Sequence, residues 1–181
     1  MKKILLITLI GLFSLSTQAQ KINWMTFNEA LEAQKTNPRK IMIDAYTTWC
    51  GPCKMLDKNT FQNTDVADYI NKNYYAVKFN AEGNEKVTYK DQDFGNPKYQ
   101  PGKTGRNSQH ELAAAMRIGA YPTIVFMNES GEIIAPIPGY KTPQQLEIYL
   151  KLFYTDSYLK IDSQEKFQEY VNTLKLEFKS S

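Results

Sequence analysis

Cysteine and histidine are scarce in this chain of 181 residues, which holds only two Cys and one His. A structural zinc site takes four ligands, most often Cys and His. The only zinc site that this sequence could form would combine Cys50, Cys53, His110 and a carboxylate. We expect no metal and no cofactor. His110 is predicted in the first turn of a helix. A stabilising disulfide framework is also excluded, because a bond between Cys50 and Cys53 closes almost no loop.

Long apolar runs are also missing. Residues 4–15 form an apolar run of about a dozen residues, which is too short to span a bilayer comfortably. Two lysines precede this run, and the small residues Thr17 and Ala19 follow it, as at a signal-peptide cleavage site. We therefore predict a signal peptide over residues 1–19, cleaved after Ala19 or one residue later, and a periplasmic or secreted protein. The alternative is an uncleaved anchor.

A strong excess of charge of either sign is absent too. The formal net charge is +3, and the loss of Lys2 and Lys3 with the signal peptide lowers it to +1. A near-neutral protein has no general electrostatic attraction for nucleic acid or for anionic membranes. We expect no nucleic-acid partner.

The overall composition is that of an ordinary globular protein, with 42% hydrophobic residues. The length favours one domain, which we place at residues 24–153, followed by an extension over residues 154–181. In the first half, helices are predicted after the capping box Thr26-x-x-Glu29, from the Cys motif towards Phe61, and after Asn63 or Thr64, with strands over 40–46 and 74–80.

In the second half, capping residues again mark the helices. Three further helices are predicted at Ser108-x-x-Glu111, Thr142-Pro143-x-Gln145 and Asp162-x-x-Glu165. Strands over 123–127 and 132–137 are predicted to form an antiparallel pair joined by a short turn. We expect the last helix, in the extension, only to cover exposed core.

Residues 81–107 differ from their surroundings. They contain four Gly and two Pro among many polar residues and show little periodicity. This pattern predicts a long loop or insertion, and loops of this length are often functional or mobile. We consider two interpretations: the segment forms one rim of a substrate groove, or it is a tolerated surface insertion.

The spacing of the two cysteines indicates chemistry. At the start of a helix, residues i and i+3 lie on one face of the first turn, so Cys50 meets unpaired N–H groups and the positive end of the helix dipole. Both favour a thiolate, the attacking species in disulfide exchange. We assign attack to Cys50 and resolution of the mixed disulfide to Cys53, which we expect to be more buried. Pro52 keeps the turn rigid, and Gly51 lets a substrate backbone come close.

An acidic residue interrupts the apolar strand before the motif. Asp44 stands six residues before Cys50, and burial there would raise its pKa. It is then able to accept and return the proton of Cys53. The alternative is a structural Asp bonded to the backbone. Lys78 on the next strand is either the charged partner of Asp44 or a solvated lysine.

These residues together resemble the thioredoxin family. Residues 49–54, Trp-Cys-Gly-Pro-Cys-Lys, match the active-site hexapeptide of that family letter for letter. The strand with Asp44, the strand with Lys78, and the segment Ile118-Gly-Ala-Tyr-Pro-Thr123 are similar to its acid-bearing strand, its lysine-bearing strand and its cis-proline segment. Gly131 and Gly139 fall where the family has its hairpin and late-strand glycines.

The resemblance implies an α/β fold with a central mixed sheet flanked by helices, here with an insertion before the cis-proline helix and a C-terminal helical tail. It also implies a cis peptide at Tyr121–Pro122 that faces the Cys pair, where the Tyr121 backbone is able to pair with an extended substrate. Trp49, Gly51 and Pro52 would then contact substrate, and Lys54 and Lys78 would support the site.

The function predicted from these features is thiol–disulfide exchange on exported proteins. We expect a monomeric reductase of protein disulfides that exchanges electrons with a membrane donor or acceptor. A disulfide oxidase or isomerase is the alternative within this class. A redox-inactive binding module and a peroxidase are the alternatives outside it, and the paired cysteines argue against the peroxidase.

Overall fold

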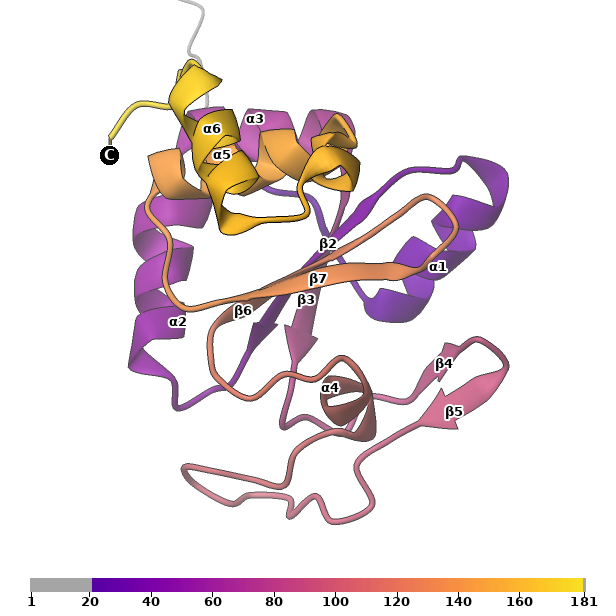
Figure 1. The fold of residues 1–181 in the computed structure, drawn as a ribbon. Coiled ribbons are helices and arrows are strands. Elements are labelled where there is room, and N and C mark those ends of the chain that lie inside the picture. Colours follow the sequence, from indigo (N-terminus) through magenta and orange to yellow (C-terminus); the bar gives the residue numbers. More distant parts are fainter. Residues whose placement is uncertain (1–20, 181) are drawn as a thin grey trace, which may run out of the picture.

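A five-stranded mixed sheet forms the centre of the protein, whose residues 21–180 are described by a computed structural model (Figure 1). The strand order is β1-β3-β2-β6-β7, with β1, β3 and β2 parallel and with antiparallel pairing of β2 with β6 and of β6 with β7. These strands are β1 (Trp24–Met25), β2 (Ile41–Tyr46), β3 (Tyr75–Asn80), β6 (Thr123–Met127) and β7 (Ile133–Pro138). The predicted fold class is confirmed. The predicted signal peptide lies outside the described residues.

Helices cover the sheet and begin where capping residues place them. They are α1 (Phe27–Thr36), α2 (Gly51–Leu56), α3 (Thr64–Asn73), α4 (Glu111–Ala115), α5 (Pro143–Tyr154) and α6 (Gln164–Thr173). Thr26 and Thr142 form complete capping boxes, and Asn63 caps α3, as predicted. The helix predicted to run from the Cys motif to Phe61 is α2, continued by a π-helical turn, η1 (Asp57–Phe61). No helix among the described residues combines the length and apolar character that a membrane span requires.

Side chains alternate between the two faces of the sheet, because successive residues of a strand point to opposite sides. On β2, Met42 joins an apolar cluster with residues of α2, α3 and α5, whereas Ile41 and Ile43 join a second cluster with residues of α1 and α4. Both faces of the sheet are therefore buried. By the same alternation, Asp44 lies on the face of Met42, the face that α2 covers.

Two predicted helix starts are wrong. Ser108 does not cap α4; His110 does, and its ring accepts a hydrogen bond from the Leu112 N–H. The carboxylate of Glu111 instead accepts from the Gly95 N–H at 2.8 Å, so contact with the distant insertion replaces the local capping box. In α6 the cap is Ser163, one residue after the predicted Asp162.

The insertion at residues 81–107 contains a hairpin that the sequence did not reveal. Strands β4 (Val87–Tyr89) and β5 (Gln92–Phe94) pair across Lys90 and Asp91, which both adopt positive φ. A two-residue hairpin turn of this kind favours Asn or Gly. The dipeptide Lys90-Asp91 is not one of the favoured pairs, so the sequence did not predict this turn.

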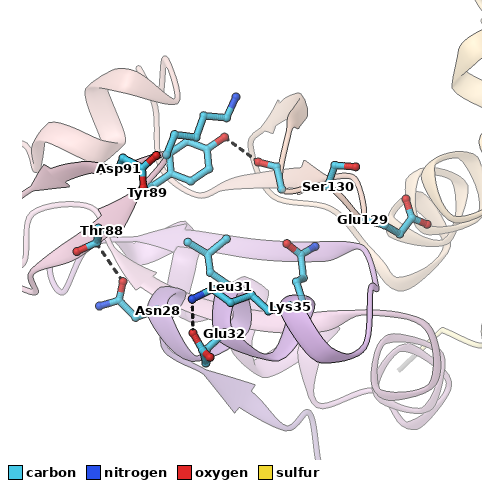
Figure 2. A pocket seen from close by; sticks show the side chains of 12 residues that line it. Asn28, Leu31, Glu32, Lys35, Thr88, Tyr89, Asp91, Glu129 and Ser130 are labelled. Carbon is cyan, nitrogen blue, oxygen red and sulfur yellow. Dashed lines mark hydrogen bonds and ion pairs between the residues drawn. The ribbon is translucent and has the colours of Figure 1, made fainter.

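This hairpin borders a hollow of about 530 Å³ between α1 and the turn that joins β6 to β7 (Figure 2). The Tyr89 hydroxyl donates to the Gly131 carbonyl at 2.7 Å, and the Thr88 N–H donates to the Asn28 side chain. The β6–β7 turn lies beside the start of β2, where Ile41 pairs with Met127, whereas the Cys motif follows the end of β2. The hollow is therefore at the end of the sheet opposite the cysteines.

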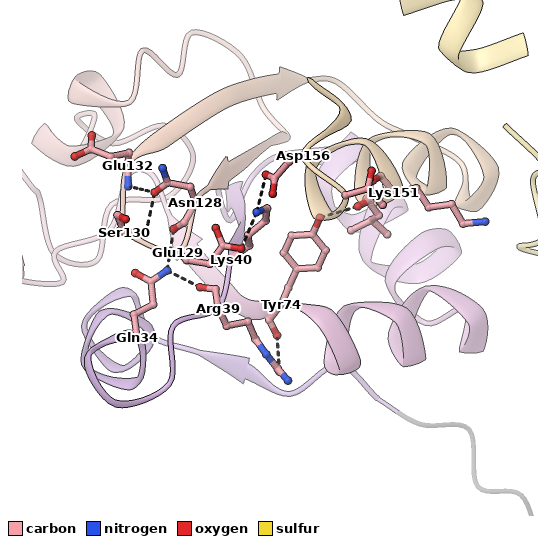
Figure 3. A network of polar contacts seen from close by, with 12 residues as sticks. Gln34, Arg39, Lys40, Tyr74, Asn128, Glu129, Ser130, Glu132, Lys151 and Asp156 are labelled. Carbon is pink, nitrogen blue, oxygen red and sulfur yellow. Dashed lines mark hydrogen bonds and ion pairs between the residues drawn. The ribbon is translucent and has the colours of Figure 1, made fainter. Parts of the chain in front are cut away.

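The C-terminal extension is fastened to the domain by buried charges. Lys40 is only 2% exposed, and its ammonium group pairs with Glu129 at 2.7 Å and with Asp156 at 2.8 Å (Figure 3). Asp156 precedes a short 3-10 helix, η2 (Ser157–Lys160), that leads into α6. Phe167 and Tyr170 of α6 pack against the apolar cluster with α3 and α5, and Phe178 near the end of the chain is buried in it.

Glu147 of α5 holds the final segment in place. Its carboxylate has no exposure, accepts the backbone N–H groups of Glu177 and Phe178 at 2.8 Å, and pairs with Lys151. We expect Glu147→Gln to cost about 2 kcal/mol, because one amide oxygen cannot satisfy both N–H groups and the ammonium. Limited proteolysis with mass spectrometry checks this: the C-terminal segment should be cut sooner than in wild type. The exposed Glu169→Gln on α6 is the control, and equal cleavage of the two variants would contradict the assignment.

Candidate functional site

The two cysteines lie at the head of α2, directly after the end of β2. They are joined by a disulfide, with a Cα–Cα distance of 5.3 Å. Cys50 is the N-cap of α2, and its sulfur accepts the N–H of Cys53 at 3.1 Å. A helix N-terminus favours negative charge, so this geometry stabilises a thiolate on Cys50 once the disulfide is reduced.

The expected difference in burial between the cysteines is wrong. Cys50 and Cys53 are each 2% exposed. The two cysteines therefore differ in position and not in burial: the Cys50 sulfur accepts the Cys53 N–H at the N-cap of α2, and Cys53 lies inside the first turn.

Asp44 is the buried acid of the site. It is 1% exposed and pairs in register with Lys78 on β3, whose ammonium contacts Oδ2 of Asp44 at 2.6 Å. Burial raises the pKa of Asp44 to about 6, although the charge of Lys78 opposes the shift. Its Oδ1 atom has no hydrogen-bond partner among the described residues. The alternative of an Asp bonded to the backbone is thus not what the structure shows, and Lys78 is the charged partner.

Asp57 is a member of this cluster that the sequence did not reveal. It lies in the first turn of η1 and forms a second, very close ion pair with Lys78. The negative charge of Asp57 also raises the pKa of Asp44. Burial lowers the pKa of Lys78, but its two carboxylate partners outweigh that effect and raise it. A hollow of about 630 Å³, lined in part by Asp57, Lys78 and Trp24, connects this ion pair with solvent.

The proline segment lies beside the Cys motif. The Tyr121–Pro122 peptide bond is cis, as the resemblance implied. The rings of Trp49 and Tyr121 meet edge to face, with centroids 6.1 Å apart. This contact brings the segment that contains Pro122 to the residue that precedes Cys50. Burial and the nearby Glu82 carboxylate raise the pKa of the Tyr121 phenol, which keeps that ring neutral.

The insertion reaches the site through Glu82, Arg106 and Asn107, none of which the sequence singled out. The Trp49 indole donates to Glu82 Oε2 at 2.7 Å, and the Asn107 N–H donates to the same oxygen at 2.8 Å. The guanidinium carbon of Arg106 lies 4.7 Å from the centre of the Trp49 ring. The Cys motif is thus bordered by both ends of the 81–107 segment, which meet at Glu82 and Asn107.

The remaining predicted site residues are at the surface or away from the cysteines. Gly51, Pro52 and Lys54 are exposed on α2, and a Cβ added at Gly51 would meet no atom within 4 Å. His110 is fully buried at the cap of α4, and its Nε2 lies 2.7 Å from the Glu85 carbonyl. Within residues 21–180, no three His, Cys, Asp or Glu side chains gather as metal ligands.

A Cys-x-x-Cys disulfide at the head of a helix, with a cis-proline beside it and a buried acid on the sheet, defines the class of thioredoxin-fold thiol–disulfide oxidoreductases. The family profile of the thioredoxin-like domain matches residues 27–154. The chain belongs to this thioredoxin-like family.

Similar proteins agree with this membership. The thiol:disulfide interchange protein DsbD of Pectobacterium atrosepticum is 24% identical over 119 residues, which make up 65% of this chain and 17% of that protein. A Bacteroides thetaiotaomicron structure, described as a candidate disulphide isomerase, is 30% identical, with a TM-score of 0.51 over 75% of this chain and 94% of that one. A thioredoxin-fold protein of Helicobacter pylori shares the fold, at 21% identity and a TM-score of 0.56 over 75% and 84% of the two chains.

Proposed function

We propose that the protein reduces disulfide bonds in exported proteins. The observation that carries this proposal is the pair of cysteines at the head of α2, above a sheet face on which Asp44 Oδ1 is buried without a partner. The site thus combines a position that stabilises a thiolate with a base that is free to take a proton.

The reaction balances with two thiols and one disulfide. The Cys50 thiolate attacks one sulfur of the substrate disulfide, which forms a mixed disulfide and releases a substrate thiolate. Asp44 takes the proton of Cys53, and the Cys53 thiolate attacks the Cys50 sulfur. The Cys50–Cys53 disulfide forms, and the second substrate sulfur leaves as a thiolate. The protein loses two electrons, and the substrate gains them.

Substrate is held by the exposed surface around the motif. Gly51 and Pro52 leave room for a chain above the cysteines, and Trp49 and Tyr121 form one wall. The backbone of Tyr121 pairs with an extended stretch of substrate, a form of strand addition.

Electrons come from outside the chain. The similarity to part of a thiol:disulfide interchange protein supports a membrane-bound partner that reduces Cys50–Cys53 after each turnover. The predicted signal peptide supports a periplasmic or secreted location, and we expect the protein to act as a monomer.

A redox titration tests the direction of the reaction. We expect the Cys50–Cys53 pair to have a potential of about −270 to −230 mV, at the reducing end of the range of this fold. Equilibration with thiol–disulfide buffers, followed by mass spectrometry of the alkylated protein, measures it. A value above about −150 mV would rule out a reductase and favour an oxidase or isomerase. The isomerase is the second candidate, because the Bacteroides thetaiotaomicron relative carries that description.

A further inference from the structure

The last part of the insertion, which reaches Trp49 through Arg106, carries positive charge only. Residues 97–106 include Lys98, Lys103 and Arg106 and no acidic residue, and all three cations are exposed. The acidic residues of the insertion lie outside this stretch: Asp91 and Asp93 belong to the β4–β5 hairpin on the side of α1, Glu85 precedes that hairpin, and Glu82 lies at the start of the insertion, where it contacts Trp49. The distribution is therefore uneven even though the chain as a whole is near neutral.

Hydrogen bonds close the last part of this segment into a defined loop. The Gln100 N–H donates to Asn107 Oδ1 at 3.0 Å, and Asn107 Nδ2 donates to the Gln100 carbonyl at 2.9 Å. These two hydrogen bonds hold the ends of the loop together, and residues 101–106 form the loop between them. We call residues 100–107 the basic tip.

The base of the basic tip is fixed to the residue next to the nucleophile. Glu82 is 9% exposed and accepts both the Trp49 indole N–H and the Asn107 N–H on Oε2. Its carboxylate thus links the motif to the tip and is occupied by two donors. Arg106 lies over the Trp49 ring at a distance typical of a cation–π contact. Its charge is thereby held over the residue that precedes Cys50, and the side chain remains exposed.

We propose that the basic tip is a docking element for substrate proteins that carry acidic residues next to the disulfide to be reduced. The inference rests on the proposed function, because whatever lies along the tip must also present a disulfide to Cys50. Arg106 and Lys103 attract the acidic flank and orient the chain across Trp49, which raises the rate of encounter and lowers KM. Arg106 and Lys103 are specificity-determining residues and take no part in the chemical step.

Two synthetic peptides test the proposal. Each contains one intramolecular disulfide, and they differ only in Glu or Lys at the positions flanking the cysteines. With the reduced full-length protein at about 50 mM salt, we expect kcat/KM to be about tenfold higher for the Glu peptide, and we expect the ratio to fall towards one at about 1 M salt. The double variant Lys103→Glu/Arg106→Glu should reverse the preference.

The control is Lys86→Glu, which makes the same kind of charge change in the same insertion. Lys86 is exposed, and its carbonyl accepts a hydrogen bond from Asn28 of α1, away from Trp49. We expect this variant to keep the wild-type preference. Equal rates for the two wild-type peptides, or an unchanged ratio in the double variant, would overturn the role of the basic tip. Failure of the wild type to reduce either peptide would instead overturn the proposed function itself.

Discussion

Cys50→Ser is expected to abolish disulfide reduction, with a loss of at least roughly a thousandfold in rate. The serine hydroxyl keeps the position of the sulfur but is not ionised at neutral pH and does not form a mixed disulfide. Cys53→Ala is expected to fail differently. Its Cys50 still attacks, but nothing resolves the adduct, so the variant accumulates mixed disulfides with its substrates. Non-reducing electrophoresis followed by mass spectrometry identifies the trapped partners.

The Cys53→Ala variant also tests the thiolate directly. In Cys53→Ala, alkylation of Cys50 across a pH series should follow a pKa well below that of a free thiol, which is about 8.5. Lys58→Ser on η1, an exposed substitution outside the site, should behave as wild type in the activity assay. If Cys50→Ser retained its biological role, the protein would act through binding, and the redox proposal would be wrong.

The sequence revealed the parts of the site that depend on short spacing. The i, i+3 cysteines and the capping boxes at Thr26 and Thr142 are local patterns, and local hydrogen bonds satisfy them in the structure. Asp44 and Lys78 were visible because each interrupts an apolar strand, and the parallel register of β2 and β3 then places them side by side.

What the sequence did not reveal depends on contacts between distant segments. The Glu82 carboxylate accepts the indole N–H of Trp49, which is 33 positions away in the sequence. The Glu111 carboxylate accepts the N–H of Gly95, 16 positions away, instead of capping its own helix. Asp57 looked like an ordinary polar residue of a helix. Only the π-helical turn and the approach of β3 bring its carboxylate to Lys78. In each case the partner of the polar side chain is distant in the sequence, so no local pattern predicts the contact.

Asp44→Asn is expected to change both stability and rate, with opposite signs at neutral pH. The folded pKa of Asp44 is about 6, above the ordinary value of 3.8, so the folded protein binds the proton more tightly than the unfolded chain does. Stability is then lost as pH rises from about 4 to about 6, and the total penalty at neutral pH is about 3 kcal/mol. Asp44→Asn carries no charge to bury. Its free energy of unfolding relative to wild type should therefore rise by about this amount over that pH range.

Denaturant unfolding of the oxidised protein at a series of pH values measures this difference, with the exposed Asp68→Asn on α3 as the control.

The kinetic effect of Asp44→Asn concerns the second step of the reaction, in which Cys53 resolves the mixed disulfide. Without a base, deprotonation of Cys53 relies on solvent, so resolution of the mixed disulfide should slow by about a hundredfold, while alkylation of Cys50 stays near the wild-type rate. A parallel pH dependence of stability in wild type and Asp44→Asn would show that no charge is buried at Asp44. Equal lifetimes of the mixed disulfide would show that the proton of Cys53 leaves by a route that does not involve Asp44.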